Sequence, residues 1–298
     1  MGTSQKGTPR FQMINKKVEC TLFGTSPLKR SYNMDWGLKN RLSRIIKPDG
    51  RTVMLAVDHG YFLGPVQRLE DPSKTIKPLL PYTDALMPTR GVLRSCVDAG
   101  IDIPIVLRAS GGNTIIGEDL SNEEITVSMK DAVRLNASAV AFSIYIGSKH
   151  EHQTIVNFSR LVDEGMEYGV PVLAVTAVGK ELEKRDARYL SLACRIAAEL
   201  GASFVKTYYC EDFEKVVKSC PVPLVIAGSP KLKTETDALE IAYEAIKRGA
   251  CGVDMGRNIW QSGNPVAMIK TIRAIVHDNI SFDKAKQMLT SLKGKTKS

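Results

Sequence analysis

Eight short apolar runs are the feature that most constrains the fold of this chain. Each run is too short for a helix and is bounded like a buried strand, and helical stretches separate one run from the next. The runs are Thr52–Val57, Ala85–Met87, Ile105–Leu107, Ala139–Ile144, Val172–Thr176, Phe204–Thr207, Leu224–Ala227 and Gly252–Met255. Continuous apolar strands that alternate with helices predict a parallel sheet. Eight such units predict a fold of the α/β class, a single (β/α)8 TIM barrel.

A sequence pattern that recurs at three helix ends supports the barrel. Three helical stretches end in Gly or Asn followed by Ala and then a strand, at Asn136-Ala137, Gly201-Ala202 and Gly249-Ala250. Each pair is typical of a helix C-cap followed by a tight loop. A doubly wound open sheet is the alternative, but no G-x-G-x-x-G fingerprint follows the first strand.

The two ends of the chain differ from its middle in charge. Residues 1–47 hold ten Lys and Arg against two acids, and residues 283–298 hold five Lys against Asp283. These ends carry +8 and +4 of a net charge of +9, so that residues 48–282 carry −3. We therefore expect a basic N-terminal arm with a closing helix over residues 1–47, a barrel over 48–282, and a basic C-terminal tail over 283–298. The arm precedes a short amphipathic helix that begins near Trp36, and the helix Pro265–His277 completes the outer ring.

Composition excludes several classes of function. The basic residues lie at the ends, and no recognition-helix, RNP-type or zinc-finger pattern accompanies them, so nucleic acid is not expected as a partner. No apolar run approaches the roughly 18 residues that span a bilayer, so a membrane is not expected either. Six cysteines without a CxxC pair indicate neither a disulfide framework nor a zinc cluster. A cytoplasmic location with reduced thiols is the expectation.

Functional residues of such barrels gather where the strands end. These positions are Asp58-His59, Thr89-Arg90, Arg108 to Asn113, Tyr145 to His152, Thr176 to Lys180, Lys206, Gly228-Ser229-Pro230-Lys231 and Gly256-Arg257-Asn258. Lys206 stands out because it lies inside the sixth strand, where alternation places it on one face with Phe204 and Tyr208. An amine among apolar neighbours loses its charge more easily and can act as a nucleophile. A lysine whose stem packs on the sheet while its ammonium reaches solvent is the structural alternative.

The glycine turns after the last two strands indicate a phosphate site. Barrels commonly bind phosphate there through backbone N–H groups and a helix N-terminus. Gly228 and Gly256 allow close approach of the backbone, Ser229 lies in the first of these turns, and Arg257 adds a fork of donors. Asp58 and His59 offer a carboxylate and an imidazole for proton transfer, although either could simply cap the next helix. Lysine, phosphate site and acid–base pair together predict Schiff-base chemistry on a phosphorylated ketone.

Two other polar stretches are weaker candidates for functional sites. His150-Glu151-His152 matches no standard metal-ligand spacing, so no metal is predicted. Lys180, Lys184, Arg185 and Arg188 form a basic loop after the fifth strand, which we expect to face solvent. A second phosphorylated substrate is the alternative use of this loop.

From about Trp36 to His277 the chain resembles the class I aldolase family of the archaeal fructose-bisphosphate aldolase type. The resemblance is carried by LAVDHG (55–60), TRG (89–91), VKTYY (205–209), IAGSPKLKT (226–234) and VDMGRNIWQ (253–261). It implies a (β/α)8 fold, Lys206 as the Schiff-base residue, Asp58 in proton transfer, and phosphate held by the last two glycine turns with Arg257. It also implies a homo-oligomer, since members are often decamers.

One departure from the aldolase pattern changes the expected reaction. Sugar-phosphate aldolases of this type carry an aromatic-x-Tyr pair at the end of the fifth strand, where this chain has Val175-Thr176-Ala177. The chain is instead similar to the branch that breaks down phosphorylated autoinducer-2, through DWGLKNRLSRI (35–45), DHGYFLGP (58–65), YIGSKHEHQ (145–153) and AVTAVGKE (174–181). That branch implies a thiolase, an acyltransferase that moves an acetyl group from 3-hydroxy-5-phosphonooxypentane-2,4-dione to coenzyme A and leaves dihydroxyacetone phosphate. Coenzyme A would be a co-substrate, and no permanently bound cofactor is implied.

Two other functions remain open from the sequence. One is a class I aldolase or transaldolase acting on sugar phosphates such as fructose 1,6-bisphosphate through another proton relay. The other is a noncatalytic phosphate-binding barrel whose basic ends contact nucleic acid. The second requires an inert Lys206, which the conjunction of motifs argues against.

Overall fold

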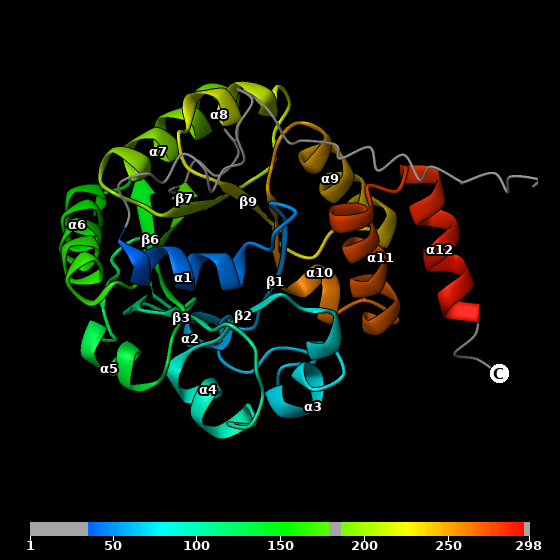
Figure 1. Ribbon diagram of the computed structural model, residues 1–298, viewed down its shortest axis with the longest axis horizontal. Helices are drawn as coiled ribbons and strands as arrows, with labels where there is room; N and C mark the ends of the chain where they lie inside the picture. Colours follow the sequence, from blue (N-terminus) through cyan, green and yellow to red (C-terminus); the bar gives the residue numbers. More distant parts are fainter. Residues whose placement is uncertain (1–34, 118, 179–185, 295–298) are drawn as a thin grey trace, which may run out of the picture.

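Eight parallel strands form a barrel at the centre of the protein (Figure 1). The computed structural model describes residues 35–117, 119–178 and 186–294 of the chain. The strands are β1 (Thr52–Ala56), β2 (Ala85–Met87), β3 (Val106–Arg108), β6 (Ala139–Ile146), β7 (Val172–Val178), β8 (Phe204–Thr207), β9 (Leu224–Ala227) and β10 (Gly252–Met255). They pair in the order β2-β1-β10-β9-β8-β7-β6-β3. A parallel bridge between Leu86 and Ile105 joins the two ends of this order and closes the barrel. The predicted (β/α)8 fold is confirmed.

Helices surround the barrel and follow most of its strands (Figure 1). They are α1 (Trp36–Ile45), α2 (Gly60–Leu63), α3 (Pro72–Ile76), α4 (Arg90–Cys96), α5 (Met129–Arg134), α6 (Glu151–Tyr168), α7 (Ala187–Glu199), α8 (Phe213–Ser219), α9 (Glu235–Lys247), α10 (Arg257–Trp260), α11 (Pro265–Asp278) and α12 (Phe282–Gly294). A 3-10 turn spans Leu80–Tyr82, and a small antiparallel pair joins β4 (Ser110–Gly111) to β5 (Glu124–Ile125).

Helix α1 closes the end of the barrel at which the strands begin. The Asp35 carboxylate caps the helix by accepting from the backbone N–H of Leu38 at 3.1 Å. On its inner side, Leu42 and Ile45 join a buried cluster with inward-facing strand residues such as Phe204. This plug leaves the opposite end of the barrel, where the strands finish, for polar side chains.

The predicted C-caps are also confirmed. Asn136, Gly201 and Gly249 have φ angles of 55°, 95° and 106°, in the left-handed region that ends a helix. At Gly201 an added Cβ would lie 2.8 Å from Cγ1 of Val162, so space as well as backbone conformation favours glycine there.

The C-terminal segment departs from the expected solvated tail. Phe282–Gly294 form α12, which buries Ala285 and Leu289 against the barrel's outer helices. Figure 1 shows α12 beside α11 at the rim of the molecule. The lysines lie on the remaining faces of this helix, and so narrow an apolar stripe in a basic segment gives little sign of a packed helix in the sequence. Residues 295–298 lie outside the described residues, as does the expected N-terminal arm up to residue 34.

No helix in the described ranges is both long and apolar enough to cross a membrane. The buried core instead lies in two shells, one inside the barrel and one between the strands and the outer helices.

A buried charge cluster ties α11 to the start of the barrel. Asp84 accepts from the backbone N–H of Val53 at 2.7 Å, from Arg273 at 2.8 Å and from Nε2 of His277 at 2.7 Å. Burial opposes protonation of His277, but its contacts with Asp84 and Asp49 raise its pKa above the ordinary value. Burial alone would raise the pKa of Asp84, but its hydrogen bonds with His277 and Arg273 outweigh burial and lower it.

This cluster predicts a loss of stability at alkaline pH. Because the native pKa of His277 is raised, its contribution is fully present below about pH 6.5 and disappears as the pH rises through the native pKa. We expect His277→Gln to lower the free energy of unfolding by about 1 kcal/mol at pH 6, because it removes charged hydrogen bonds at a partly exposed site. Urea unfolding at pH 6 and pH 9 measures the effect. A His277→Gln deficit that is no smaller at pH 9 would contradict this linkage.

Candidate active site

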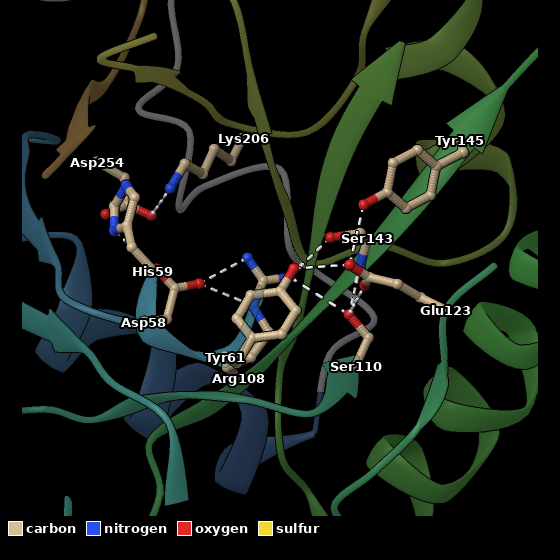
Figure 2. Close-up of polar contacts among 10 residues, drawn as sticks. All are labelled: Asp58, His59, Tyr61, Arg108, Ser110, Glu123, Ser143, Tyr145, Lys206 and Asp254. Atoms are coloured by element: carbon tan, nitrogen blue, oxygen red, sulfur yellow. Dashed lines mark hydrogen bonds and ion pairs between the residues drawn. The ribbon is translucent and has the colours of Figure 1, made fainter. Parts of the chain in front are cut away.

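Lys206 lies inside the barrel, as its position in the strand predicts. Its side chain is buried, and its Nζ lies 2.9 Å from Oδ2 of Asp254 on β10 (Figure 2). Phe204, two residues earlier on β8, belongs to the core cluster inside the barrel. This confirms that Phe204 and Lys206 lie on the same face of the strand. The ammonium of Lys206 therefore does not reach free solvent along the outside of the sheet. Its partner Asp254 was not among the residues singled out from the sequence.

Asp58 ends β1 and forms a buried ion pair with Arg108 at the end of β3. One carboxylate oxygen of Asp58 accepts from Nε of Arg108 at 2.8 Å and lies 2.8 Å from NH2 of the same guanidinium. Burial alone would raise the pKa of Asp58, but Arg108, His59 and Lys206 outweigh burial and lower it. Asp58 is therefore held as a carboxylate at neutral pH.

His59 is a neutral imidazole next to this pair. Burial lowers the pKa of His59 to about 4, although the neighbouring Asp58 carboxylate opposes the shift. Its ring packs edge-on against Trp260, with the ring centroids 5.4 Å apart, and its Nδ1 lies 3.6 Å from Asp58. A Cβ at Gly256 would lie only 2.4 Å from Cε1 of His59, so this position requires glycine for the imidazole to fit. The structure thus brings Asp58, His59 and Gly256 together.

A hydrogen-bonded network extends from Arg108 across the barrel mouth (Figure 2). NH1 of Arg108 donates to Ser143 on β6 at 2.8 Å and to Ser110 on β4 at 3.3 Å. Ser110 donates at 2.5 Å to Glu123, the residue that precedes β5. The pairing of β4 with β5 is what carries this loop carboxylate back to the mouth of the barrel.

Glu123 also accepts from two phenols. Tyr61 on α2 donates to it at 2.6 Å, and Tyr145 on β6 donates to the same oxygen at 2.9 Å. Burial raises the pKa of both phenols, and the charge of Glu123 adds to the shift, so both remain protonated donors. The position of Tyr145 at a strand end is visible in the sequence, whereas nothing there indicates Glu123, because it follows a long loop.

The predicted phosphate residues lie on two loops that one side chain joins. Asn258 on α10 accepts from the backbone N–H of Leu232 at 2.9 Å and donates to the carbonyl oxygens of Gly228 and Pro230. This side chain ties the loop after β9 to the helix after β10. Within the loop after β9, Ser229 has a φ of 61°, a left-handed conformation that turns the loop sharply.

Arg257 begins α10 directly after Gly256. Its guanidinium is partly buried, and its Nε has no hydrogen-bond partner within the described residues. Burial lowers the pKa of Arg257, against smaller opposing effects of Tyr208 and Asp58. A buried, unpaired N–H is costly, so it indicates a group that an anion would satisfy. The two loops and Arg257 therefore lie together, in agreement with the sequence.

Two further polar candidates, Arg90 and His150, have other partners. Arg90 pairs with Asp131 on α5 at 3.0 Å, and His150 lies 3.8 Å from Asp119. Within residues 35–117, 119–178 and 186–294, no group of three or more His, Cys, Asp or Glu side chains is suited to a metal ion. Of the basic loop, Lys180, Lys184 and Arg185 lie outside the described residues, and Arg188 is on α7.

Fold and site together define a (β/α)8 barrel with a buried lysine–aspartate pair and a polar network at its mouth. Comparison with known proteins adds the family. The model of the DeoC/LacD family aldolases matches residues 52–262, and the chain belongs to this family.

Curated relatives are similar over nearly the whole chain. The 3-hydroxy-5-phosphonooxypentane-2,4-dione thiolase of Klebsiella pneumoniae is 59% identical over 276 residues, which cover 92% of each chain. The thiolase of the same name from Yersinia pseudotuberculosis is 57% identical over 263 residues, 88% of this chain and 89% of the relative.

Solved structures of aldolases share the fold. An archaeal fructose 1,6-bisphosphate aldolase has a TM-score of 0.74 at 28% identity and covers 81% of this chain and 99% of its own. A second structure, of an archaeal fructose-1,6-bisphosphate aldolase whose catalytic Lys is covalently bound to the carbinolamine intermediate of the substrate, has the same TM-score and identity over 80% of this chain and 99% of its own.

Proposed function

We propose that this protein is a Schiff-base-forming thiolase, an acyltransferase that moves an acetyl group from 3-hydroxy-5-phosphonooxypentane-2,4-dione to coenzyme A. The observation that carries the proposal is 57–59% identity to thiolases of that name over about nine-tenths of the chain. The buried Lys206 supports it, since the reaction needs an amine that can condense with a ketone.

The reaction begins with Lys206. Its amine adds to the ketone that bears the phosphooxymethyl group, and loss of water gives an iminium. The thiol of coenzyme A then adds to the other carbonyl, that of the acetyl group: sulfur bonds to the carbon, the carbonyl electron pair moves to oxygen, and the thiol proton passes to His59. The electron pair on oxygen re-forms the carbonyl, the bond between this carbon and the hydroxylated carbon breaks, its electron pair moves to the iminium, and acetyl-CoA leaves. The resulting enamine takes a proton on carbon and is hydrolysed to dihydroxyacetone phosphate and free Lys206.

Asp58 and His59 have different roles in this proposal. Asp58 is held ionised by Arg108, so it supplies negative charge beside the cationic iminium rather than a proton. His59 is neutral and can therefore accept a proton or donate one through its two ring nitrogens. We assign proton relay during enamine release to His59, oriented by Trp260 and the carboxylate of Asp58.

The phosphate of the substrate is assigned to Gly228, Ser229, Gly256 and Arg257. Support comes from the unpaired Nε of Arg257 and from the Asn258 side chain, which fixes the two loops relative to each other. Phosphate held at these loops would keep the far end of the substrate stationary while the carbons react at Lys206.

Arg257→Ala should weaken binding of dihydroxyacetone phosphate. Loss of charged hydrogen bonds costs about 1.5–3 kcal/mol, which corresponds to a roughly 10- to 150-fold higher dissociation constant. Isothermal titration with Lys206→Ala in the background measures binding without imine formation. Arg248→Ala is the matched control, because Arg248 pairs with Glu214 and Glu244 outside the site. Unchanged affinity of the Arg257→Ala protein would place the anion elsewhere.

We also propose the setting of the reaction. The protein would act in the cytoplasm on phosphorylated autoinducer-2, as a homo-oligomer such as a decamer, with coenzyme A as co-substrate and no permanently bound cofactor or metal. Six cysteines without a CxxC pair support a reducing compartment.

The function is tested by product analysis. The phosphorylated pentanedione should give acetyl-CoA and dihydroxyacetone phosphate in equal amounts, and only when coenzyme A is present. Formation of an aldehyde instead, without need for coenzyme A, would favour the aldolase.

A further inference from the structure

Asp254 is a buried carboxylate that the proposed reaction has so far left without a role. It lies on β10 with no exposed side-chain surface, and its Oδ2 is 2.9 Å from Nζ of Lys206. Its other oxygen, Oδ1, has no hydrogen-bond partner within the described residues. A carboxylate with no further partners is an expensive way to fix the position of a lysine, because the desolvation of two charges offsets their attraction.

The two carboxylates near Lys206 differ in how firmly they hold their charge. Asp58 is bound by two nitrogens of Arg108, and this contact helps to lower its pKa. Burial raises the pKa of Asp254, and the nearby charge of Asp58 adds to this shift, against the opposing effects of Lys206 and Arg108. Asp254 is therefore the carboxylate of the pair that can accept a proton at the least cost.

We propose that Asp254 is the acid–base catalyst of imine formation at Lys206, a role that rests on the proposed Schiff-base function. At rest Lys206 is an ammonium and Asp254 a carboxylate. As the substrate ketone arrives, the ammonium passes one proton to Oδ2, which leaves a free amine and a neutral carboxylic acid. The amine nitrogen forms a bond to the carbonyl carbon, and the carbonyl electron pair moves to oxygen.

The remaining proton transfers balance. The oxygen takes a proton from the nitrogen, which gives a carbinolamine with a hydroxyl group. Asp254 returns its proton to this hydroxyl, which leaves as water, and the nitrogen lone pair forms the C=N bond of the iminium. The net change is ketone and ammonium to iminium and water. Asp254 ends as a carboxylate beside a cation, as it began.

This exchange of one cation for another explains why the partner is a buried acid. The carboxylate stabilises the ammonium before the step and the iminium after it, so the site needs little reorganisation between them. The unpartnered Oδ1 leaves room for a second hydrogen bond, which the carbinolamine hydroxyl can donate as it forms.

The test compares Asp254→Asn with the wild-type protein in borohydride trapping of dihydroxyacetone phosphate. The maximal rate of Lys206 labelling should fall at least about 100-fold, the usual range for loss of a general acid–base group. The concentration of dihydroxyacetone phosphate that gives half the maximal rate should change less than about threefold. A second measurement uses dihydroxyacetone phosphate with ¹⁸O in its ketone group. Its exchange of ¹⁸O into water should slow by a similar factor in the Asp254→Asn protein, because this exchange depends directly on dehydration of the carbinolamine.

A matched control separates chemistry from folding. Asp84→Asn changes another buried acid, at the opposite end of the barrel, and should leave the labelling rate unchanged below its melting temperature. An Asp254→Asn protein that labels at the wild-type rate overturns the role of Asp254. So does a folded variant with a large rise in the half-maximal concentration but an unchanged maximal rate, because the carboxylate would then only position Lys206. A wild-type protein that is not labelled at all overturns both this role and the Schiff-base function. If the wild-type protein is labelled on Lys206, the Schiff-base function is supported, and the Asp254→Asn result tests only the role of Asp254.

Discussion

Replacing Lys206 with Ala should abolish both turnover and covalent trapping. Lys206 supplies the nitrogen of the iminium, and no other group can accept the electron pair when the carbon–carbon bond breaks. Turnover should fall to the uncatalysed background, a loss of roughly 10⁶-fold or more, because enzymatic accelerations begin near that value. Borohydride reduction with dihydroxyacetone phosphate, followed by peptide mass mapping, should place the label on Lys206 in the wild-type protein and nowhere in the variant.

Lys206→Arg is the matched control for charge. It keeps a cation beside Asp254, so the buried carboxylate retains a partner, but the guanidinium is too weak a nucleophile to form an imine. We expect it to fold and to remain unlabelled. Lys231 lies on the loop after β9, and burial lowers its pKa, so it is the described lysine most able to compete. A label on Lys231 in the wild-type protein would remove Lys206 from the reaction.

The barrel is predictable from the sequence because its strands are buried on both faces. The run at β9 contains an apolar residue at every position and the run at β1 at every position after Thr52, a pattern typical of strands buried on both faces. The left-handed caps at Asn136 and Gly201 are local features and appear in the sequence for the same reason. Helix α12 is different, since only Ala285 and Leu289 of its residues are buried. So narrow an apolar stripe is hard to recognise among the five lysines of residues 283–298.

The site is predictable where a residue type is unusual at its position. A lysine inside β8 and glycines after β9 and β10 meet that condition. Asp254 lies within an apolar strand as well, but an isolated acid there indicates nothing until Lys206 is found 2.9 Å away. Glu123 is beyond sequence reasoning, because its approach depends on the pairing of β4 with β5 and on two tyrosines from different elements.

The second large effect separates a thiolase from an aldolase. The wild-type protein should cleave the phosphorylated pentanedione only with coenzyme A, and should cleave fructose 1,6-bisphosphate at a rate lower by at least about 100-fold, because aldol cleavage needs a general base to deprotonate a sugar hydroxyl. Position 177 at the end of β7 pairs in register with Tyr145, and it is Ala, which transfers no proton. The phenol of Tyr145 itself is bound to Glu123 and has a raised pKa, so it is a poor substitute. Thiolysis starts instead with the addition of the thiol to a carbonyl, so no sugar hydroxyl has to be deprotonated by a phenol.

The variant Ala177→Tyr restores the tyrosine that the thiolase sequence lacks. A phenol at position 177 adds both bulk and a proton-transfer group at the end of β7, where the resembling aldolases carry tyrosine. We expect acetyl-CoA formation to fall and fructose 1,6-bisphosphate cleavage to rise slightly above the wild-type rate. Ala177→Phe is the control, because it adds nearly the same bulk without the hydroxyl and should lose thiolase activity with no gain in aldol cleavage. Both substrates are assayed side by side with and without coenzyme A. Efficient fructose 1,6-bisphosphate cleavage by the wild-type protein, indifferent to coenzyme A, would show that Ala177 does not mark a change of reaction and that the protein is an aldolase.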